Sequence, residues 1–221
     1  IKTPRIQSFS EAISLRSFGG DFLHEMLKFD PNFHSAPISV KDCHGEDRDI
    51  DEVLSDRDKP LLFVQLKSAE LYRSISSQDI IESLVRDFVV IECGNVSRFV
   101  GAVGNYYSLN AQLDQYIAVI KYADACLCTD SSLMHIAKAW VKPVVLLAGP
   151  TDDQTLLKHY QFGVSLRSES HEPCIPCWRN GVTPCFIHNT HASPCLDEFN
   201  CEEIKTAINS VIARYNDLRA N

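Results

Sequence analysis

Residues 125–151 read ACLCTDSSLMHIAKAWVKPVVLLAGPT, and this stretch decides the fold class. Two short apolar runs, 125–129 and 143–148, have the length and composition of buried strands, and residues 131–140 between them have apolar side chains at helical spacing. Strands that are apolar throughout and alternate with helices are typical of a parallel sheet that helices cover on both faces. The stretch therefore predicts an α/β fold.

The same alternation continues on both sides of this stretch. Further strands are expected at 61–66 and 88–93, and helices at 76–85, 112–123 and 200–215. We expect residues 60–221 to form one domain, with a cysteine-rich loop at 171–196. Residues 1–59 predict two short helices and a polar linker.

The composition is that of an ordinary globular protein, with 221 residues of which 45% are hydrophobic and 23% are charged. Its net charge of −8 argues against a nucleic-acid partner, because a phosphate backbone requires a basic face. The longest apolar runs fall far short of the ~20 residues that cross a bilayer, so no transmembrane segment is expected. The chain starts with Ile1 rather than Met, and we expect it to be part of something longer.

Two loops follow the strands of the quoted stretch, at 129–132 and 148–153. Ligands of such sheets bind beyond the carboxyl ends of the strands, where the first N–H groups of a helix are unsatisfied and attract anions. Ser131 and Ser132 add hydroxyl donors, so a phosphate fits this edge. The alternative is that Asp130 or Ser131 only caps the helix and that His135 is a helix residue with a satisfied ring.

The motif DSSLMHIAKA at 130–139, followed by KPVVLLAGPT at 142–151, resembles the signature of glycosyltransferase family 9, the heptosyltransferases of bacterial surface polysaccharide. In that family an Asp, a Ser or Thr, usually a Gly, and then a His three residues further on precede a strand that ends in Gly-Pro-Thr. The similarity also includes 61–84, 109–124 and the cysteine-bearing segment after residue 174. It therefore covers about residues 60–215.

This resemblance implies a GT-B glycosyltransferase, built of two facing Rossmann-like domains. Its C-terminal domain would bind a nucleotide-diphosphate sugar without a divalent metal. The donor-binding residues that the resemblance implies are Arg73, Asp130, Ser131, Ser132, His135, Gly149, Pro150 and Thr151. Among them, Asp130 would lie by the sugar, the two serines at the diphosphate, His135 behind it, and Arg73 would reach the phosphates.

The acceptor site and the catalytic base belong to the N-terminal domain in this family, and residues 1–59 are too short to form it. We therefore expect a missing domain or a partner chain to supply the base, and a saccharide or a protein to be the acceptor. The last helix, 200–215, has an apolar stripe that packs either on this sheet or across the cleft on the second domain.

The clustered cysteines predict one structural metal ion. The four expected ligands are Cys174, Cys177, Cys185 and Cys195. A Cys-x-x-Cys pair and two later cysteines can complete a tetrahedron, which suits zinc or iron. The resemblance to the family implies that iron is one of the two options. Cys201 is left over, and His171, His188 and His191 are possible substitutes. The alternatives are free thiols or two disulfides. The odd number of cysteines is typical of a reducing compartment, so a cytoplasmic location is expected.

Two other functions compete with donor binding. Ser132 stands where the family usually has Gly, and Arg98 where an acid often binds the ribose. These departures are consistent with a non-catalytic scaffold that keeps the fold and the cysteine centre. A sugar-nucleotide epimerase of the GT-B type is the third hypothesis.

Overall fold

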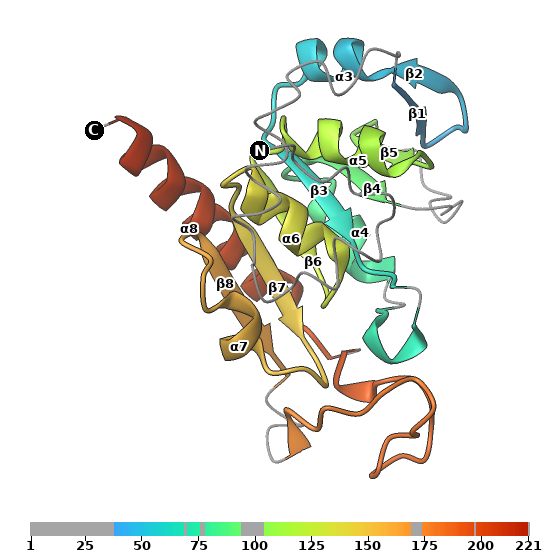
Figure 1. Cartoon of the computed structure of the whole chain (residues 1–221). Coiled ribbons are helices and arrows are strands. Elements are labelled where there is room, and N and C mark those ends of the chain that lie inside the picture. The colour runs from blue at the N-terminus through green and yellow to red at the C-terminus, as the bar shows by residue number, and fades with distance from the viewer. Residues whose placement is uncertain are drawn as a thin grey trace, which may run out of the picture.

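An eight-stranded sheet runs through the chain, in the order β2-β1-β5-β4-β3-β6-β7-β8 (Figure 1). The structure is a computed structural model that describes residues 38–68, 70–75, 78–93, 104–168, 174–196 and 198–220. The strands are β1 Ser39–Asp42, β2 Asp47–Asp49, β3 Leu61–Gln65, β4 Val89–Cys93, β5 Tyr106–Leu109, β6 Ala125–Cys128, β7 Val144–Ala148 and β8 Gly163–Arg167. From β5 to β8 all neighbours pair in parallel, which confirms the predicted α/β fold with a mostly parallel sheet.

Helices cover the sheet on both faces, because alternate residues of each central strand point to opposite sides. The helices are α3 Ile50–Asp56, α4 Gln78–Leu84, α5 Leu113–Ile120, α6 Ser132–Ala139, α7 Asp153–Leu157 and α8 Cys201–Ala220. Phe63 of β3 packs with α5 and α6 on one face, whereas Leu62 and Val64 pack with α4 and α8 on the other. Short helical turns lie at Leu71–Arg73 (η2) and Pro194–Leu196 (η4).

The segment expected as a linker joins the sheet instead. Residues 38–59 form β1, β2 and α3, and β1 pairs antiparallel with both β2 and β5. The acidic residues that suggested a solvated linker lie on the exposed side of these elements, while Ile38, Val40 and Val53 are buried. Alternation over only three or four residues gave too weak a periodic signal. The two short helices expected before residue 30 lie outside the described residues.

The terminal helix packs on this sheet. Asn200 caps α8 by accepting a hydrogen bond from the Glu202 N–H at 2.8 Å, which confirms the predicted helix start. Ile204, Ile208 and Val211 are buried with strands β6 and β7 and helix α4. The apolar stripe therefore packs on this sheet, which is the first of the two expected alternatives. None of the helices in the described ranges is long and apolar enough to span a membrane.

Candidate functional site

The site lies where β3, β6 and β7 end, beside η2 and the segment after residue 174 (Figure 1). Three of its loops meet at Asp130, directly after β6. Its Oδ2 accepts a hydrogen bond from Thr151 Oγ1 at 2.9 Å and lies 3.6 Å from Arg73 Nη1. Arg73 Nη1 also donates to the Asp130 carbonyl oxygen at 3.4 Å. The structure thus brings together three residues that are far apart in the sequence.

Several polar atoms at this point are buried without a hydrogen-bond partner among the described residues. They are Arg73 Nε, Thr129 Oγ1, Asp130 Oδ1 and Ser131 Oγ. Buried polar groups in native proteins are nearly always paired, and leaving one unpaired costs about 1–3 kcal/mol. A cluster of such atoms at the carboxyl edge of a parallel sheet indicates a polar ligand.

Helix α6 begins at this cluster without a side-chain cap. Ser131 is its N-cap residue and has extended backbone angles, φ −147° and ψ 172°, but its side chain makes no capping hydrogen bond. The Asp130 carboxylate is held by Thr151 and Arg73 instead. The alternative that these residues only cap the helix therefore does not describe the structure, and the first N–H groups of α6 remain for an anion.

His135 lies one turn into α6, on the same face as Ser131 and Ser132. Its Nδ1 lies 3.1 Å from the hydroxyl oxygen of Tyr160, on the turn between α7 and β8. Tyr160 is fixed in turn by Gly163, where a Cβ atom would lie 2.8 Å from the Tyr160 Cβ. Tyr160 is a partner of the site that sequence reasoning missed.

Gly149 and Pro150 contact the cysteine-bearing segment. A Cβ on Gly149 would lie 2.8 Å from Leu196 Cδ2, so the absence of a side chain lets Leu196 pack on the loop. The Pro150 carbonyl oxygen accepts a hydrogen bond from the Trp178 N–H at 2.8 Å. These two positions, expected among the donor-binding residues, have a packing role in the described structure, while Thr151 reaches Asp130.

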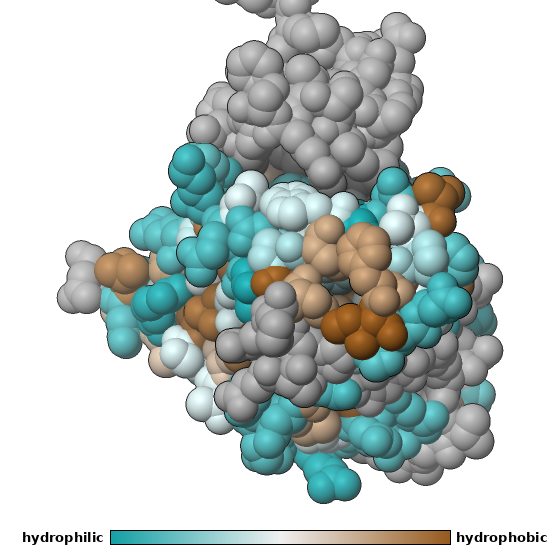
Figure 2. Space-filling model, turned by 90° about the horizontal axis from the view of Figure 1, so that it is seen from below, coloured by the Kyte–Doolittle hydropathy of each residue, from teal (hydrophilic) through white to brown (hydrophobic). Residues whose placement is uncertain are grey.

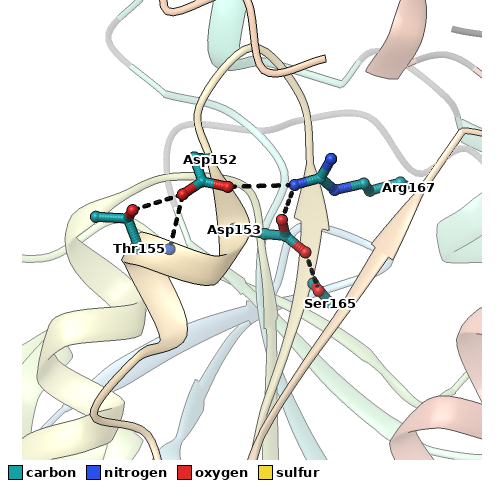
Figure 3. A network of polar contacts seen from close by, with 5 residues as sticks. All are labelled: Asp152, Asp153, Thr155, Ser165 and Arg167. Carbon is teal, nitrogen blue, oxygen red and sulfur yellow. Dashed lines mark hydrogen bonds and ion pairs between the residues drawn. The ribbon is translucent and has the colours of Figure 1, made fainter. Parts of the chain in front are cut away.

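A polar network beyond Thr151 fixes this loop against the edge of the sheet (Figure 3). Arg167 of β8 pairs with Asp152 at 3.4 Å and with the buried Asp153, which also accepts a hydrogen bond from Ser165. Asp152 caps α7 through the Thr155 N–H at 3.0 Å. Hydrogen bonds from Thr155, together with the charge of Arg167, hold the pKa of Asp152 below its usual value. Only the Asp before a helix start signalled part of this network in the sequence.

A pocket of about 280 Å³ opens at the same edge of the sheet. It is lined by Phe63, Gln65, Cys93, Leu113, Tyr116, Ile120, Ser132, Leu133 and Ile136. The lining is mostly apolar and aromatic, and Ser132 connects it to the start of α6. Burial raises the pKa of the Cys93 thiol to about 11, so this thiol stays neutral near neutral pH.

We call residues 174–196 the Cys-rich lobe. Of its four predicted ligands Cys195 is the most buried: burial, and next the charges of Cys174, Cys177 and Cys185, raise the pKa of its thiol to about 12. All the cysteines of the chain are free thiols, so the two-disulfide alternative is not what the structure shows. Among the described residues, however, no three His, Cys, Asp or Glu side chains are placed as metal ligands. The structural metal therefore stays a prediction.

Two of the other candidate ligands make separate contacts. Cys201 Sγ contacts the Asp79 carbonyl oxygen at 3.8 Å, on the helix pair α4 and α8. His191 Nδ1 lies 3.2 Å from the Gly181 carbonyl oxygen. His171 and Arg98 lie outside the described residues.

A buried arginine orders much of the lobe, and sequence reasoning missed it. The Arg179 guanidinium donates to the carbonyl oxygens of Thr183 at 3.0 Å, His191 at 3.1 Å and Ala192 at 2.6 Å. It also donates to Ser193 Oγ at 2.6 Å. An arginine within an irregular segment gives no sequence signal of such a role, because its acceptors are backbone groups that only the folded loop brings together.

Comparison with known proteins identifies the central segment. Residues 110–182 match the family model of glycosyltransferase family 9 (heptosyltransferase). This segment contains the loop at Asp130, helix α6 and the loop at Gly149, and it confirms the resemblance inferred from the sequence. It is about a third of the chain. Among curated proteins, no sequence matches the chain.

Solved structures of similar fold are heptosyltransferases and related enzymes. The ADP-heptose LPS heptosyltransferase II of E. coli aligns with a TM-score of 0.56 and 14% identity, over 78% of this chain and 54% of that one. A family 9 glycosyl transferase from Veillonella parvula aligns with a TM-score of 0.53 and 13% identity, over 74% and 50% of the two chains. The iron-containing dodecameric glycosyltransferase TibC of enterotoxigenic E. coli aligns with a TM-score of 0.54 and 14% identity, over 72% and 46%. The chain thus spans about half the length of these structures.

Proposed function

We propose that this chain is the donor-binding half of a family 9 glycosyltransferase and holds a nucleotide-diphosphate sugar at the edge formed by Arg73, Asp130 and Ser131. The observation that carries the proposal is the cluster of buried polar atoms without partners around the uncapped start of α6. A diphosphate accepts hydrogen bonds from Arg73 Nε, from the Thr129 and Ser131 hydroxyls and from the first N–H groups of α6, and it is attracted by the helix dipole and by the Arg73 charge. Asp130 Oδ1 can only accept, so its partner is a donor such as a hydroxyl of the sugar.

The pocket beside Ser132 is suited to the nucleobase. A flat base can pack on its apolar and aromatic lining, and the amide of Gln65, at the end of β3, can form a hydrogen bond with the base. Asp130 lies between the diphosphate position and Thr151, and we assign it to the donor sugar.

In the transfer reaction, the acceptor hydroxyl oxygen forms a bond to the anomeric carbon while the bond from that carbon to the diphosphate oxygen breaks. The electron pair of the broken bond stays on the leaving diphosphate, and the hydroxyl proton goes to a base. Arg73 and the α6 N–H groups stabilise the charge that grows on the diphosphate. The base is assigned to a missing domain or partner chain, as in the heptosyltransferases that this chain resembles.

Calorimetric titration of the chain with ADP, UDP and GDP sugars tests this function. Binding of one of them is expected, and Ser131→Asp should abolish it, because a fixed carboxylate then stands where the phosphate binds. Ser210→Asp is the matched control, since Ser210 is exposed on α8 far along the chain from the site, and it should leave affinity unchanged. If none of the sugar nucleotides binds the unmodified chain, donor binding is wrong.

We further infer that Cys174, Cys177, Cys185 and Cys195 bind one structural ion, zinc or iron. Four free thiols within one lobe fit the thiolate preference of both metals, although their placement does not form a ligand set. The iron-containing TibC makes iron the first metal to measure. When bound, the ion would cross-link the lobe and leave no open position for substrate.

Elemental analysis tests the metal centre. About one equivalent of zinc or iron is expected per chain, and Cys177→Ser should lose it together with order in the lobe. Cys43→Ser, remote in sequence from the lobe, should retain the metal. Metal-free protein whose lobe amides are nonetheless protected from exchange contradicts the centre.

A further inference from the structure

The Cys-rich lobe contacts two of the loops that form the candidate donor site. On the β7 side, the Trp178 N–H binds the Pro150 carbonyl oxygen, and Leu196 packs on Gly149. On the β3 side, the lobe touches η2, the short turn that carries Arg73. The Cys-rich lobe forms the end of the molecule that Figure 2 views from below, and apolar side chains gather near the middle of this view.

The lobe holds η2 through a chain of polar contacts. Arg179 donates to Ser193 Oγ at 2.6 Å, and Ser193 Oγ donates to the Tyr72 carbonyl oxygen at 2.5 Å. The guanidinium carbon of Arg179 lies 5.5 Å from the centroid of the Tyr72 ring, and that of Arg73 lies 5.3 Å from the same ring. Tyr72 thus links the buried arginine of the lobe to the arginine of the site.

Close packing adds a second contact between the lobe and η2. The Glu70 carboxylate lies against Gly181, so the lobe backbone approaches the residue just before the turn. A side chain at Gly181 would displace the Glu70 carboxylate, which is the flexible end of an exposed side chain.

How firmly η2 is held depends on its contacts with neighbouring segments. It is a single turn of three residues, Leu71–Arg73, and none of them is buried; Leu71 is 69% exposed. Two backbone hydrogen bonds close the turn, and Ser74 Oγ and the Ile75 N–H tie its end to Ser68, Glu70 and Leu66. Short turns of this type have poor hydrogen-bond geometry, so the contacts of Tyr72 with the lobe add to the fixation of the turn and of Arg73.

We propose that Ser193 and Arg179 are positioning residues for Arg73, so that the order of the Cys-rich lobe sets the affinity of the site for a diphosphate. The inference rests on the proposed donor-binding function. It explains why a cysteine-rich segment lies at the edge of a nucleotide site: the lobe places a phosphate-binding cation at a fixed distance from Asp130 and the start of α6. Loss of lobe order, whether by thiol modification or by substitution, then weakens phosphate binding without touching the phosphate contacts.

A double-mutant cycle read with inorganic pyrophosphate separates positioning from general damage. Ser193→Ala should weaken pyrophosphate binding about fivefold or more when Arg73 is present, and by less than about twofold in an Arg73→Ala background. The same factor in both backgrounds overturns the proposal, because Ser193 then acts on something other than Arg73. Ser210→Ala, on the exposed face of α8, is the control and should change neither background.

Hydrogen exchange on the unliganded chain gives a second test that does not depend on phosphate binding. In Ser193→Ala and Arg179→Met, the amides of residues 70–75 should exchange faster, while those of β3 and β6 should not. Unchanged exchange at 70–75 in both variants refutes the proposal that the lobe positions η2. If the unmodified chain binds neither pyrophosphate nor a sugar nucleotide, the donor-binding function fails, and the exchange result still decides whether the lobe holds η2.

Discussion

The central strands and the Cys-rich lobe lie next to each other but are held by different forces. The side chains of β3, β6 and β7 are almost all fully buried, and their neighbours are apolar. In the lobe, Trp178 is 59% exposed, Phe186 74% and Val182 83%. Its order comes from one buried guanidinium and from contacts with the loops of the site.

This difference predicts that the sheet and the lobe respond differently to substitutions. The sheet gains stability from many interchangeable apolar contacts, each proportional to buried area. The lobe depends on a few directional polar contacts, each of which has a defined partner. Loss of one apolar group should therefore lower the free energy of unfolding of the whole domain. Loss of one central polar residue, such as Arg179, should disorder the lobe and leave the sheet folded.

The largest effect is expected in the sheet. Leu127→Ala in β6 should lower the free energy of unfolding by about 3 kcal/mol, because the side chain is fully buried and the cavity cannot be filled by its neighbours. Urea unfolding measures it. Phe186→Ala in the lobe is the matched truncation of an exposed side chain and should change stability by less than about 0.5 kcal/mol. Equal losses in the two variants would break the comparison.

Removal of the Arg179 guanidinium should have a smaller effect that is confined to the lobe. Arg179→Met removes the hydrogen bonds to three carbonyl oxygens and to Ser193, and a hydrogen bond to a charged group contributes about 1.5–3 kcal/mol. We expect proteolysis and hydrogen exchange to increase within 174–196, with the urea midpoint of the sheet nearly unchanged. A fall in that midpoint as large as that of Leu127→Ala would show that the two regions unfold as one.

Alkaline pH should lower the free energy of unfolding through the buried thiols of the sheet. Burial raises the pKa of Cys126 from 9.0 to about 12, so the folded state binds this proton more tightly than the unfolded chain does. The stabilising effect is complete below pH 9 and is lost as the pH rises toward 12. At pH 10 the loss amounts to about 1.4 kcal/mol.

Cys126→Ala provides the measurement. The decrease in unfolding free energy from pH 8 to pH 10 should be smaller in this variant than in the unmodified chain, by about 1.4 kcal/mol. Cys43→Ala, at a partly buried position outside the central strands, serves as the control and should keep the full pH dependence. An unchanged slope in Cys126→Ala shows that this thiol does not titrate on unfolding.

The sequence by itself determined the central α/β alternation, the start of α8 at Asn200 and the loop at Asp130. These features are local: a strand or helix is marked by the spacing of its own apolar residues, and the carboxyl ends of parallel strands necessarily share one edge. The strands β1, β2, β5 and β8 were not expected, because they lack the continuous apolar runs that mark the equally short central strands.

Only the tertiary structure decided how the polar residues pair. Ser193 binds the carbonyl oxygen of Tyr72 across a separation of 121 residues, and Thr151 binds Asp130 from the next loop. Leu196 packs on Gly149, and Arg179 donates hydrogen bonds to carbonyl oxygens of its own lobe. A hydrogen bond depends on where two atoms meet in space, and no spacing along the chain encodes that position. The pattern of burial could therefore be predicted from the sequence, whereas the partners of the buried polar groups became evident only in the folded chain.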